Sequence, residues 1–295
     1  MEISESRRED IDEIVDFIMT RTPQQDRVIL RSVLNQNAVR SRRVLLARES
    51  GGALAGVSVA QAAENLPAGL LTVMVSTRAD QGGRGLGSRL HTAALADLPD
   101  EVTQLVTAIL DGDRTSLDVA RHWGYTSVQR SMTVACALAD ATAPEPPSGD
   151  VTFEACDDLV FDDDEAVEAM LLASQTNPEA EQGVIVTLSG LRDTPTPGQR
   201  PVAVLTRVGR GPAAISFAIA DGDQMHVAYT GVDPGLRGRA LARATKEFLH
   251  AHAKDLGIRT ALTDNAENNA GIRHVNEQLG YAPHSAWHFL IRERP

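Results

Sequence analysis

A short loop pattern occurs twice in the chain, and its composition is suited to binding an anion. The copies are Gly82-Gly83-Arg84-Gly85-Leu86-Gly87 and Arg237-Gly238-Arg239-Ala240-Leu241-Ala242. Each copy lies between an apolar run that predicts a strand and a segment with helical periodicity. A helix that begins directly after such a turn leaves its first backbone N–H groups unpaired, and the helix dipole adds positive potential there. The pattern therefore predicts two places where a pyrophosphate could bind.

The elements around the two loops recur in the same order. The first half predicts a helix at 11–19, strands at 44–47, 54–60 and 70–75, a helix from 86, a strand at 105–110, a helix up to 123 and a strand at 132–137. The second half predicts strands at 202–205, 213–220 and 225–232, a helix at 241–256, a strand at 260–263, a helix up to 279 and a strand at 287–291. Gly85 and Ala240 are 155 residues apart, and Gly124 and Gly280 are 156 apart. This regularity indicates a duplication.

A Pro-rich segment separates the two halves. Residues 141–149 read ATAPEPPSG, which is typical of a semi-rigid linker, and the periodic patterns stop before it and resume after it. We therefore predict one domain over residues 1–140, a linker over 141–150 and a second domain over 151–295. A length of 295 residues agrees with two domains of ordinary size.

Composition narrows the class of protein. The net charge is −12 and no basic cluster is interleaved with aromatic residues, which argues against a nucleic-acid-binding surface. No stretch is long and apolar enough to span a membrane, so we expect a cytoplasmic protein without a membrane partner. The two cysteines, Cys136 and Cys156, have no metal-ligand spacing, and no metal site is expected. An acidic cluster in residues 157–165 could steer a cationic substrate, but helix capping is the better supported interpretation.

Taken together, these motifs resemble one known family. A strand, a (Gln/Arg)-x-x-Gly-x-(Gly/Ala) turn, a long helix, a strand and a helix ending in Leu-Gly-Phe/Tyr are similar to the GNAT superfamily of acyl-CoA-dependent N-acyltransferases. Val232-Asp233-Pro234 before the second turn and residues 265–269 (NAENN) strengthen the resemblance, and the duplication resembles tandem, actinobacterial members. The resemblance implies an α/β (α+β) fold with two tandem GNAT-like domains. Each would have a mixed, mostly antiparallel sheet that splays open to hold acetyl-CoA or another acyl-CoA.

The resemblance also implies cofactor-binding residues, and it favours the second half. There the pyrophosphate would be bound by the backbone N–H groups of Arg237, Gly238, Arg239, Ala240, Leu241 and Ala242, and in the first half by the turn that contains Arg84, Gly85 and Gly87. The acyl carbonyl would be held by a backbone N–H at Val232 or, in the first half, at about Thr77. Asn269 matches the asparagine that contacts the CoA arm, whereas Asp113 occupies that position in the first half. Against this, Ala240 replaces the central glycine of the turn, and Gly82 replaces Gln/Arg in the first copy.

Candidates for proton transfer are less well defined. Many members of the family have a tyrosine acid at the position held here by Asn276 and, in the first half, by Ala120. Asn276 could hydrogen-bond the thiol sulfur, and His226, Tyr229 and Glu267 are candidates for a base. Each of these three also has a structural interpretation, as a satisfied strand histidine, as sheet packing and as a solvated loop carboxylate respectively.

The resemblance thus implies an acetyl-CoA-dependent N-acetyltransferase that acts on a primary amine of a small molecule by direct attack on the thioester. In this interpretation the first domain is degenerate, and the protein is a monomer or a homodimer. The alternative is a non-catalytic protein that binds acyl-CoA or presents an interface, and the missing tyrosine in both halves favours it.

Overall fold

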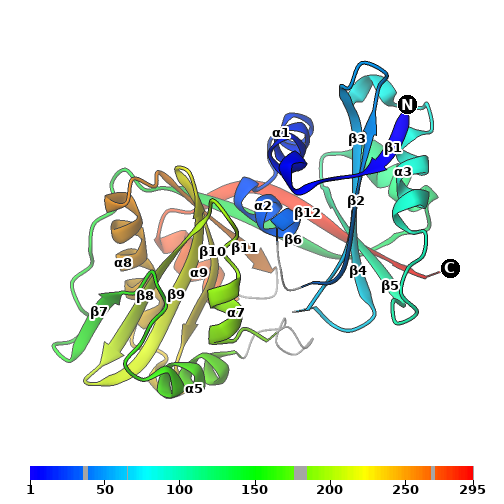
Figure 1. The fold of residues 1–295 in the computed structure, drawn as a ribbon. Coiled ribbons are helices and arrows are strands. Elements are labelled where there is room, and N and C mark those ends of the chain that lie inside the picture. The colour runs from blue at the N-terminus through cyan, green and yellow to red at the C-terminus, as the bar shows by residue number, and fades with distance from the viewer. Residues whose placement is uncertain (36–38, 65, 176–184, 267–269, 295) are drawn as a thin grey trace. The chain divides into compact units, whose positions relative to one another are not determined.

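The computed structural model describes residues 1–35, 39–64, 66–175, 185–266 and 270–294. The chain forms two compact units, which are described separately below (Figure 1). Unit 1 consists of Met1–Ser131 and Ser285–Pro295, and unit 2 consists of Met132–His284.

Unit 1 contains the predicted elements of the first half up to the helix that ends at 123, with β1 and α2 in addition, and the predicted strand at 132–137 lies in unit 2 as part of β6. Its elements are β1 (Glu2–Glu5), η1 (Arg8–Asp10), α1 (Ile11–Arg21), α2 (Arg27–Asn35), β2 (Val39–Arg48), β3 (Leu54–Ala63), β4 (Leu70–Thr77), η2 (Ala79–Gln81), α3 (Leu86–Ala94), β5 (Gln104–Leu110), α4 (Arg114–His122) and most of β12 (Ala282–Glu293). The strand order is β1-β2-β3-β4-β5-β12. The strands are antiparallel except for β4 and β5, which are parallel.

The two faces of the unit 1 sheet are covered by different helices. Leu71 and Val73 of β4 belong to a core that includes Leu90 of α3 and Leu117 of α4. Met74, the next residue along the strand, packs instead on the core formed with α1 and α2. This alternation is that of a strand buried on both faces. Figure 1 shows α1 and α2 on one side of this sheet and α3 on the other.

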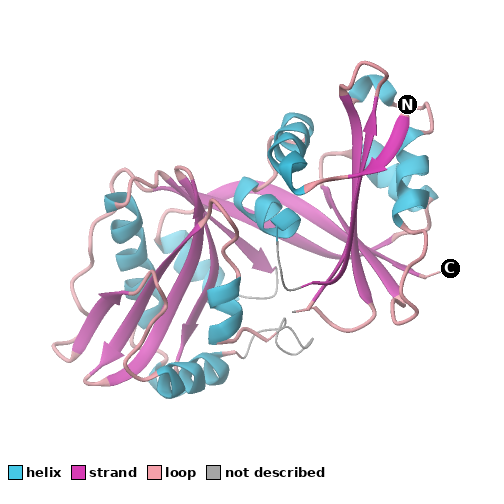
Figure 2. Ribbon diagram, in the orientation of Figure 1, coloured by secondary structure: helices cyan, strands magenta, loops and turns pink. Residues whose placement is uncertain are grey.

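Unit 2 repeats this plan. Its elements are β7 (Val151–Ala155), α5 (Asp164–Ser174), α7 (Leu188–Asp193), β8 (Arg200–Val208), β9 (Gly211–Asp221), β10 (Gln224–Val232), η3 (Pro234–Leu236), α8 (Leu241–Asp255), β11 (Thr260–Ala266), α9 (Ala270–Gln278) and part of β6 (Thr126–Ala137). The strand order is β6-β11-β10-β9-β8-β7, and β10 and β11 are parallel. In each unit the helices lie on both faces of the strands (Figure 2). The predicted α/β fold, with a mixed and mostly antiparallel sheet in each half, is therefore confirmed.

The units differ from the contiguous domains that the linker predicts. β12, at the end of the chain, pairs with β5 of unit 1 over Trp287↔Leu110 to Glu293↔Gln104. β6 continues into unit 2, where the N–H of Leu138 donates to the carbonyl of Arg259 at 2.8 Å. Each half therefore supplies a strand that runs into the other unit. Sequence periodicity identifies a strand but not its pairing partner, because backbone hydrogen bonds depend little on which side chains lie opposite.

The acidic cluster has the structural role predicted for it. Asp163 is the N-cap of α5, and its Oδ1 accepts the N–H of Ala166 at 2.9 Å. Asp157 accepts the N–H of Ala203 at 3.0 Å and contacts the imidazole of His252 at 2.9 Å. These carboxylates are engaged by the fold, which leaves no need for a role in steering a substrate.

Candidate functional site

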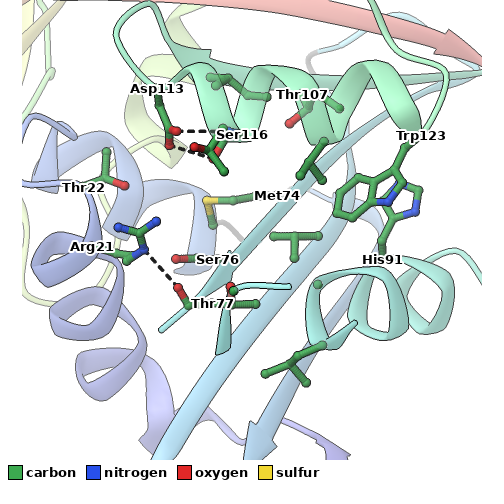
Figure 3. Close-up of a pocket in the computed structure, with 18 of the residues that line it drawn as sticks. Arg21, Thr22, Met74, Ser76, Thr77, His91, Thr107, Asp113, Ser116 and Trp123 are labelled. Carbon is green, nitrogen blue, oxygen red and sulfur yellow. Dashed lines mark hydrogen bonds between the residues drawn. The ribbon is translucent and has the colours of Figure 1, made fainter. Parts of the chain in front are cut away.

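A cavity of about 460 Å³ opens in unit 1 between β4 and β5 (Figure 3). The two strands pair only from Leu70↔Gln104 to Thr72↔Val106. Beyond Thr72 they diverge, and side chains of both strands line the space, together with residues of α1, α3, α4 and the loop after β4. Because β4 is covered by helices on both faces, the cavity passes from the α3 side of the sheet to the α1 side.

The loop after β4 directs backbone N–H groups into the α3 end of the cavity. Gly83 and Gly85 have φ values of 72° and 75°, a left-handed conformation that glycine adopts without strain. Gly85 is the N-cap of α3. The described chain provides no hydrogen-bond acceptor for the N–H groups of Gly83 and residues 85–88. Arg84 on this turn is exposed and adds a positive charge. The loop therefore has the unsatisfied donors and the charge that an anion requires.

The α1 side of the cavity is lined by polar groups. Arg21, the last residue of α1, donates from Nε to the carbonyl oxygen of Thr77 at 3.0 Å. Thr22, Gln25 and Ser76 also line the space here. Thr77 is the last residue of β4 and pairs with Gly56 of β3, so Arg21 is fixed against the end of β4.

The wall formed by α3 and α4 is aromatic. His91 stacks on Trp123 with ring centroids 4.2 Å apart, and its Nε2 lies 3.1 Å from the hydroxyl of Tyr125. Burial, aided by the charge of Arg292, lowers the pKa of His91 to about 4, and burial raises the pKa of Tyr125 to about 12. Both groups are therefore neutral at pH 7. Asp113, the N-cap of α4, accepts the backbone N–H and the hydroxyl of Ser116 at 3.0 and 2.7 Å.

The matching turn of unit 2 has the same backbone conformation but different contacts. Ala240 is the N-cap of α8 with φ of 58°, so the alanine adopts the left-handed conformation of Gly85 despite its Cβ. Arg237 donates to the carbonyl of Ser174 at 3.0 Å. Arg239 donates to the hydroxyl of Ser148 at 3.3 Å and lies 3.5 Å from a carboxylate oxygen of Asp150. Both arginines predicted to support a phosphate thus have partners within the protein.

Side chains of unit 2 fill positions that line the cavity in unit 1. Lys246 and Asn276 correspond to His91 and Ala120, with offsets of 155 and 156 residues. The Nζ of Lys246 donates to Oδ1 of Asn276 at 2.5 Å, and both side chains are buried. The Nζ also lies 4.5 Å from the ring centroid of Tyr281. This buried hydrogen bond joins α8 to α9 where unit 1 has open space.

Two further contacts involve the strands of unit 2 that correspond to β4 and β5. Thr263 of β11 donates to the carbonyl of Val227 on β10 at 2.9 Å, where the β10 register shifts by a bulge. The hydroxyl of Tyr229 lies 2.6 Å from Oγ of Ser174, and a Cβ built at Gly231 would meet both atoms. Thr263 and Tyr229 correspond to Thr107 and Met74, both of which line the cavity of unit 1.

The remaining predicted residues of the second half are dispersed or lie outside the described chain. Glu267 and Asn269 are outside the described residues. His226 is buried on β10 opposite Leu262 and has an interaction within the protein. Val232 pairs with Ala214 at the end of β10, in the position equivalent to Thr77 at the end of β4. Among the predicted bases, Tyr229 is thus hydrogen-bonded to Ser174, and His226 is buried with an interaction inside the protein.

Sequence reasoning missed the residues that shape the unit 1 cavity, above all Arg21 and His91. The repeat contained a signal for His91: the offset of 155 residues aligns this histidine with Lys246, so two different ionisable residues hold the same position in two halves that otherwise align closely. No pattern marked Arg21, since an arginine at the end of an amphipathic helix is common. Within the described residues, no group of His, Cys, Asp and Glu is placed to hold a metal ion, and no helix is long and apolar enough to cross a membrane.

Comparison with known proteins gives a match in structure alone. No protein-family model and no curated protein matches the sequence. The structure is similar to a tandem GNAT protein from the clavulanic acid biosynthesis pathway, with 18% identity, a TM-score of 0.75 and coverage of 100% of this chain and 99% of that one. It is also similar to a GCN5-related N-acetyltransferase from Sphaerobacter thermophilus, with 15% identity, a TM-score of 0.73 and coverage of 100% and 96%. A third, from Kribbella flavida, has 20% identity, a TM-score of 0.61 and coverage of 91% and 93%.

The chain has the tandem GNAT fold. The similarity extends over the full length of two of these proteins, so it includes the duplication and not one GNAT-like half alone. The predicted resemblance is therefore confirmed at the level of fold. The two copies of this fold share a backbone plan, but the parallel strands of unit 1 enclose a cavity, whereas in unit 2 a side chain of β11 bonds to β10 and a buried hydrogen bond joins α8 to α9.

Proposed function

We propose that unit 1 binds an acyl-CoA in the cavity between β4 and β5 and transfers its acyl group to the amine of a small molecule. The observation that carries this proposal is the cavity itself, which joins a turn of unpaired N–H groups to the opposite face of the sheet. The sequence favoured unit 2 on the basis of Arg237 and Asn269. In unit 2 Asn276 is bonded to Lys246 and Thr263 bridges β11 to β10, which moves the proposal to unit 1.

The residues of unit 1 fit this cofactor. The N–H groups of residues 85–88 can donate hydrogen bonds to a pyrophosphate, and Arg84 can add a charge-assisted hydrogen bond. Asp80, the nearby carboxylate, is held by Arg78 through Nε at 2.7 Å, so its charge is compensated. The pantetheine arm would run between β4 and β5, where the strands leave backbone groups facing the cavity. When bound, the cofactor supplies a thioester, whose carbonyl carbon is the electrophile.

The chain's own part in the reaction would be to position the reactants and to exclude water. The amine nitrogen forms a bond to the thioester carbonyl carbon, the carbon–sulfur bond breaks, and the sulfur leaves as a thiolate. The backbone N–H of about Thr77 would polarise the carbonyl, as the fold implies. Ala120 cannot protonate the thiolate, and Nε2 of His91 and the hydroxyl of Tyr125 are 3.1 Å apart, so that each is engaged by the other. We therefore assign both proton transfers to water, with positioning contributing up to about 7–11 kcal/mol in the best-oriented cases.

A matched pair of substitutions tests where the cofactor binds. Gly87 and Ala242 occupy the same position in the first turn of α3 and α8, and both are half-buried. A glutamate is acceptable in a first helical turn, so Gly87→Glu and Ala242→Glu should both fold. Each places a negative charge beside the proposed or the alternative phosphate site, where repulsion at about 4 Å amounts to several kcal/mol.

Isothermal titration with CoA should give one site in the wild-type protein. We expect Gly87→Glu to weaken this binding at least tenfold, and Ala242→Glu to leave it unchanged. The opposite result would place the site in unit 2, and no effect from either variant would refute cofactor binding at the helix termini.

The non-catalytic alternative keeps one observation in its favour, which is that neither copy has an acid at the position of Ala120 and Asn276. Release of free thiol from acetyl-CoA with a panel of amines separates the two functions. Turnover above the rate without protein supports the transferase. Binding of CoA without turnover for any amine supports the alternative.

A further inference from the structure

The α1 face of the cavity carries a positive charge that the protein does not neutralise. Four charged or ionisable side chains besides Tyr125 line the cavity, namely Arg21, Arg78, His91 and Asp113. Arg78 is paired with Glu49 and Asp80, and Asp113 is used as the N-cap of α4. Burial keeps the pKa of His91 at about 4, so its ring is neutral. Within the described chain, Arg21 has no carboxylate partner.

The geometry of Arg21 leaves its outer edge available for a ligand. Its Nε donates to the carbonyl oxygen of Thr77 at 3.0 Å, which fixes the plane of the guanidinium at the end of β4. No atom of the described chain accepts a hydrogen bond from the two terminal nitrogens. In Figure 3 these nitrogens lie on the side of the guanidinium that faces away from Thr77. Two parallel N–H groups in one plane match the two oxygens of a carboxylate.

Among the described residues, unit 2 has no such charge at the end of the helix that corresponds to α1. Arg21 is the last residue of α1, and Ser174 is the last residue of α5. Ser174 is buried, bonded through its hydroxyl to Tyr229, and its carbonyl accepts Arg237. Within the described chain, the guanidinium that accompanies the cavity of unit 1 therefore has no counterpart at the end of α5.

We propose that Arg21 forms a carboxylate-binding subsite beside the reacting end of the cavity, and this rests on the function proposed above. α1 and α2 cover the face of the sheet opposite α3, so Arg21 lies away from the N–H groups assigned to the pyrophosphate. A carboxylate at this position has two possible sources. It belongs either to the acceptor, which is then an amino acid, or to the acyl group, which is then derived from a dicarboxylic acid. In both cases the same carboxylate–guanidinium pair positions the substrate.

Paired substrates distinguish the sources. Thiol release is measured with acetyl-CoA and amino acids, each compared with the amine that lacks its carboxylate, and with succinyl-CoA in place of acetyl-CoA. The wild type is compared with Arg21→Gln and Arg21→Lys. Arg27→Gln serves as the control, because Arg27 forms a surface ion pair with Asp16 at 3.0 Å and does not line the cavity.

We expect Arg21→Gln to raise the KM for carboxylate-bearing substrates about tenfold to a hundredfold more than for their carboxylate-free partners, the effect of losing a charge-assisted pair. Arg21→Lys should give an intermediate value, because it keeps the charge but loses the planar pair of donors. The subsite is assigned to the acceptor if the effect follows the amino acid and to the acyl group if it follows succinyl-CoA. Equal effects on both members of every substrate pair would overturn the proposal.

The test remains decisive without turnover. If no substrate releases thiol, the transferase proposal fails, and titration of succinyl-CoA and acetyl-CoA into the wild type and Arg21→Gln replaces the kinetic readout. Tighter binding of succinyl-CoA, lost in Arg21→Gln, would support an acyl-side subsite in a binding protein. The same affinity for both ligands in both proteins, together with no difference between amino acids and amines titrated onto the CoA complex, would refute it.

Discussion

Lys246 is expected to make the stability of unit 2 rise with pH. Its ammonium group is buried, it is held by the neutral Asn276 and the ring of Tyr281, and no carboxylate of the described residues forms an ion pair with it. Burial therefore lowers its pKa from 10.5 to about 7. Replacing it by methionine removes the charge at similar volume, so Lys246→Met is the perturbation that isolates this effect.

The sign and size follow from the two pKa values. Below pH 7 the lysine is protonated in both the folded and the unfolded chain, and the full cost of burying the charge, about 5 kcal/mol, opposes folding. Between pH 7 and 10.5 the folded protein has released this proton and the unfolded chain has not. The free energy of unfolding should therefore increase by about 1.4 kcal/mol per pH unit, or about 2 kcal/mol between pH 7 and 9. Lys246→Met should lack this increase.

The assay compares urea midpoints from pH 6 to 9.5 for the wild type, Lys246→Met and Lys254→Met. Lys254 is the chain's second lysine, lies on the same helix and is exposed, so its variant should keep the wild-type slope. With only two lysines, ¹³C labelling at Cε gives two NMR signals, and the Lys246 signal should titrate near pH 7. Parallel stability curves for the wild type and Lys246→Met, or a Lys246 signal that titrates near 10.5, would refute the reasoning.

Three further predictions concern the turns, a cap and a buried ring. Gly85→Ala should lower the free energy of unfolding by about 1 kcal/mol and Ala240→Gly should raise it by up to the same amount, because both residues have a left-handed backbone conformation. Urea denaturation measures both changes. A loss of stability in Ala240→Gly would contradict the backbone strain inferred for Ala240. Asp163→Ala should cost about 1 kcal/mol through the lost N-cap of α5, with Asp163→Asn close to wild type in thermal unfolding. His91 is neutral in the fold down to about pH 4, so stability should fall as the pH drops from 6.5 to 4, and His91→Phe should weaken this dependence; a His91 NMR titration near pH 6.5 would argue against it.

The fold could be predicted from the sequence because its signals are local. The 155-residue offset between Gly85 and Ala240 marks matched turns, and the two residues do share the left-handed conformation. Strand and helix periodicity identified β4 and β10 and the helices that follow them. The pairing of β12 with β5 could not be predicted, since it joins residues almost 180 positions apart, as for Trp287 and Leu110, through backbone groups that leave no trace in side-chain pattern.

The site was predicted less well, because an open cavity depends on what several distant side chains leave unfilled. Asn276 was considered as a group that could contact a thiol, and the structure gives its oxygen to Lys246 instead. Arg237 was considered as a phosphate ligand, and it donates to the carbonyl of Ser174. A sequence gives the residue types, but hydrogen-bond competition between a ligand and the protein is decided by contacts across helices and strands that no short motif contains.

The two copies have the same turn and differ in the space behind it. The turn is tolerant, because Ala240 adopts the backbone conformation of Gly85 at a cost of about 1–2 kcal/mol. The space behind the turn depends strongly on the side chains around it. In unit 2 a buried hydrogen bond joins Lys246 to Asn276, whereas His91 and Ala120 at the matching positions of unit 1 line an open cavity. Once such a pair forms, removing either partner leaves a buried polar group unsatisfied, which costs about 1–3 kcal/mol. The closed state of unit 2 is therefore stabilised against single substitutions, and reopening it requires both residues to change together.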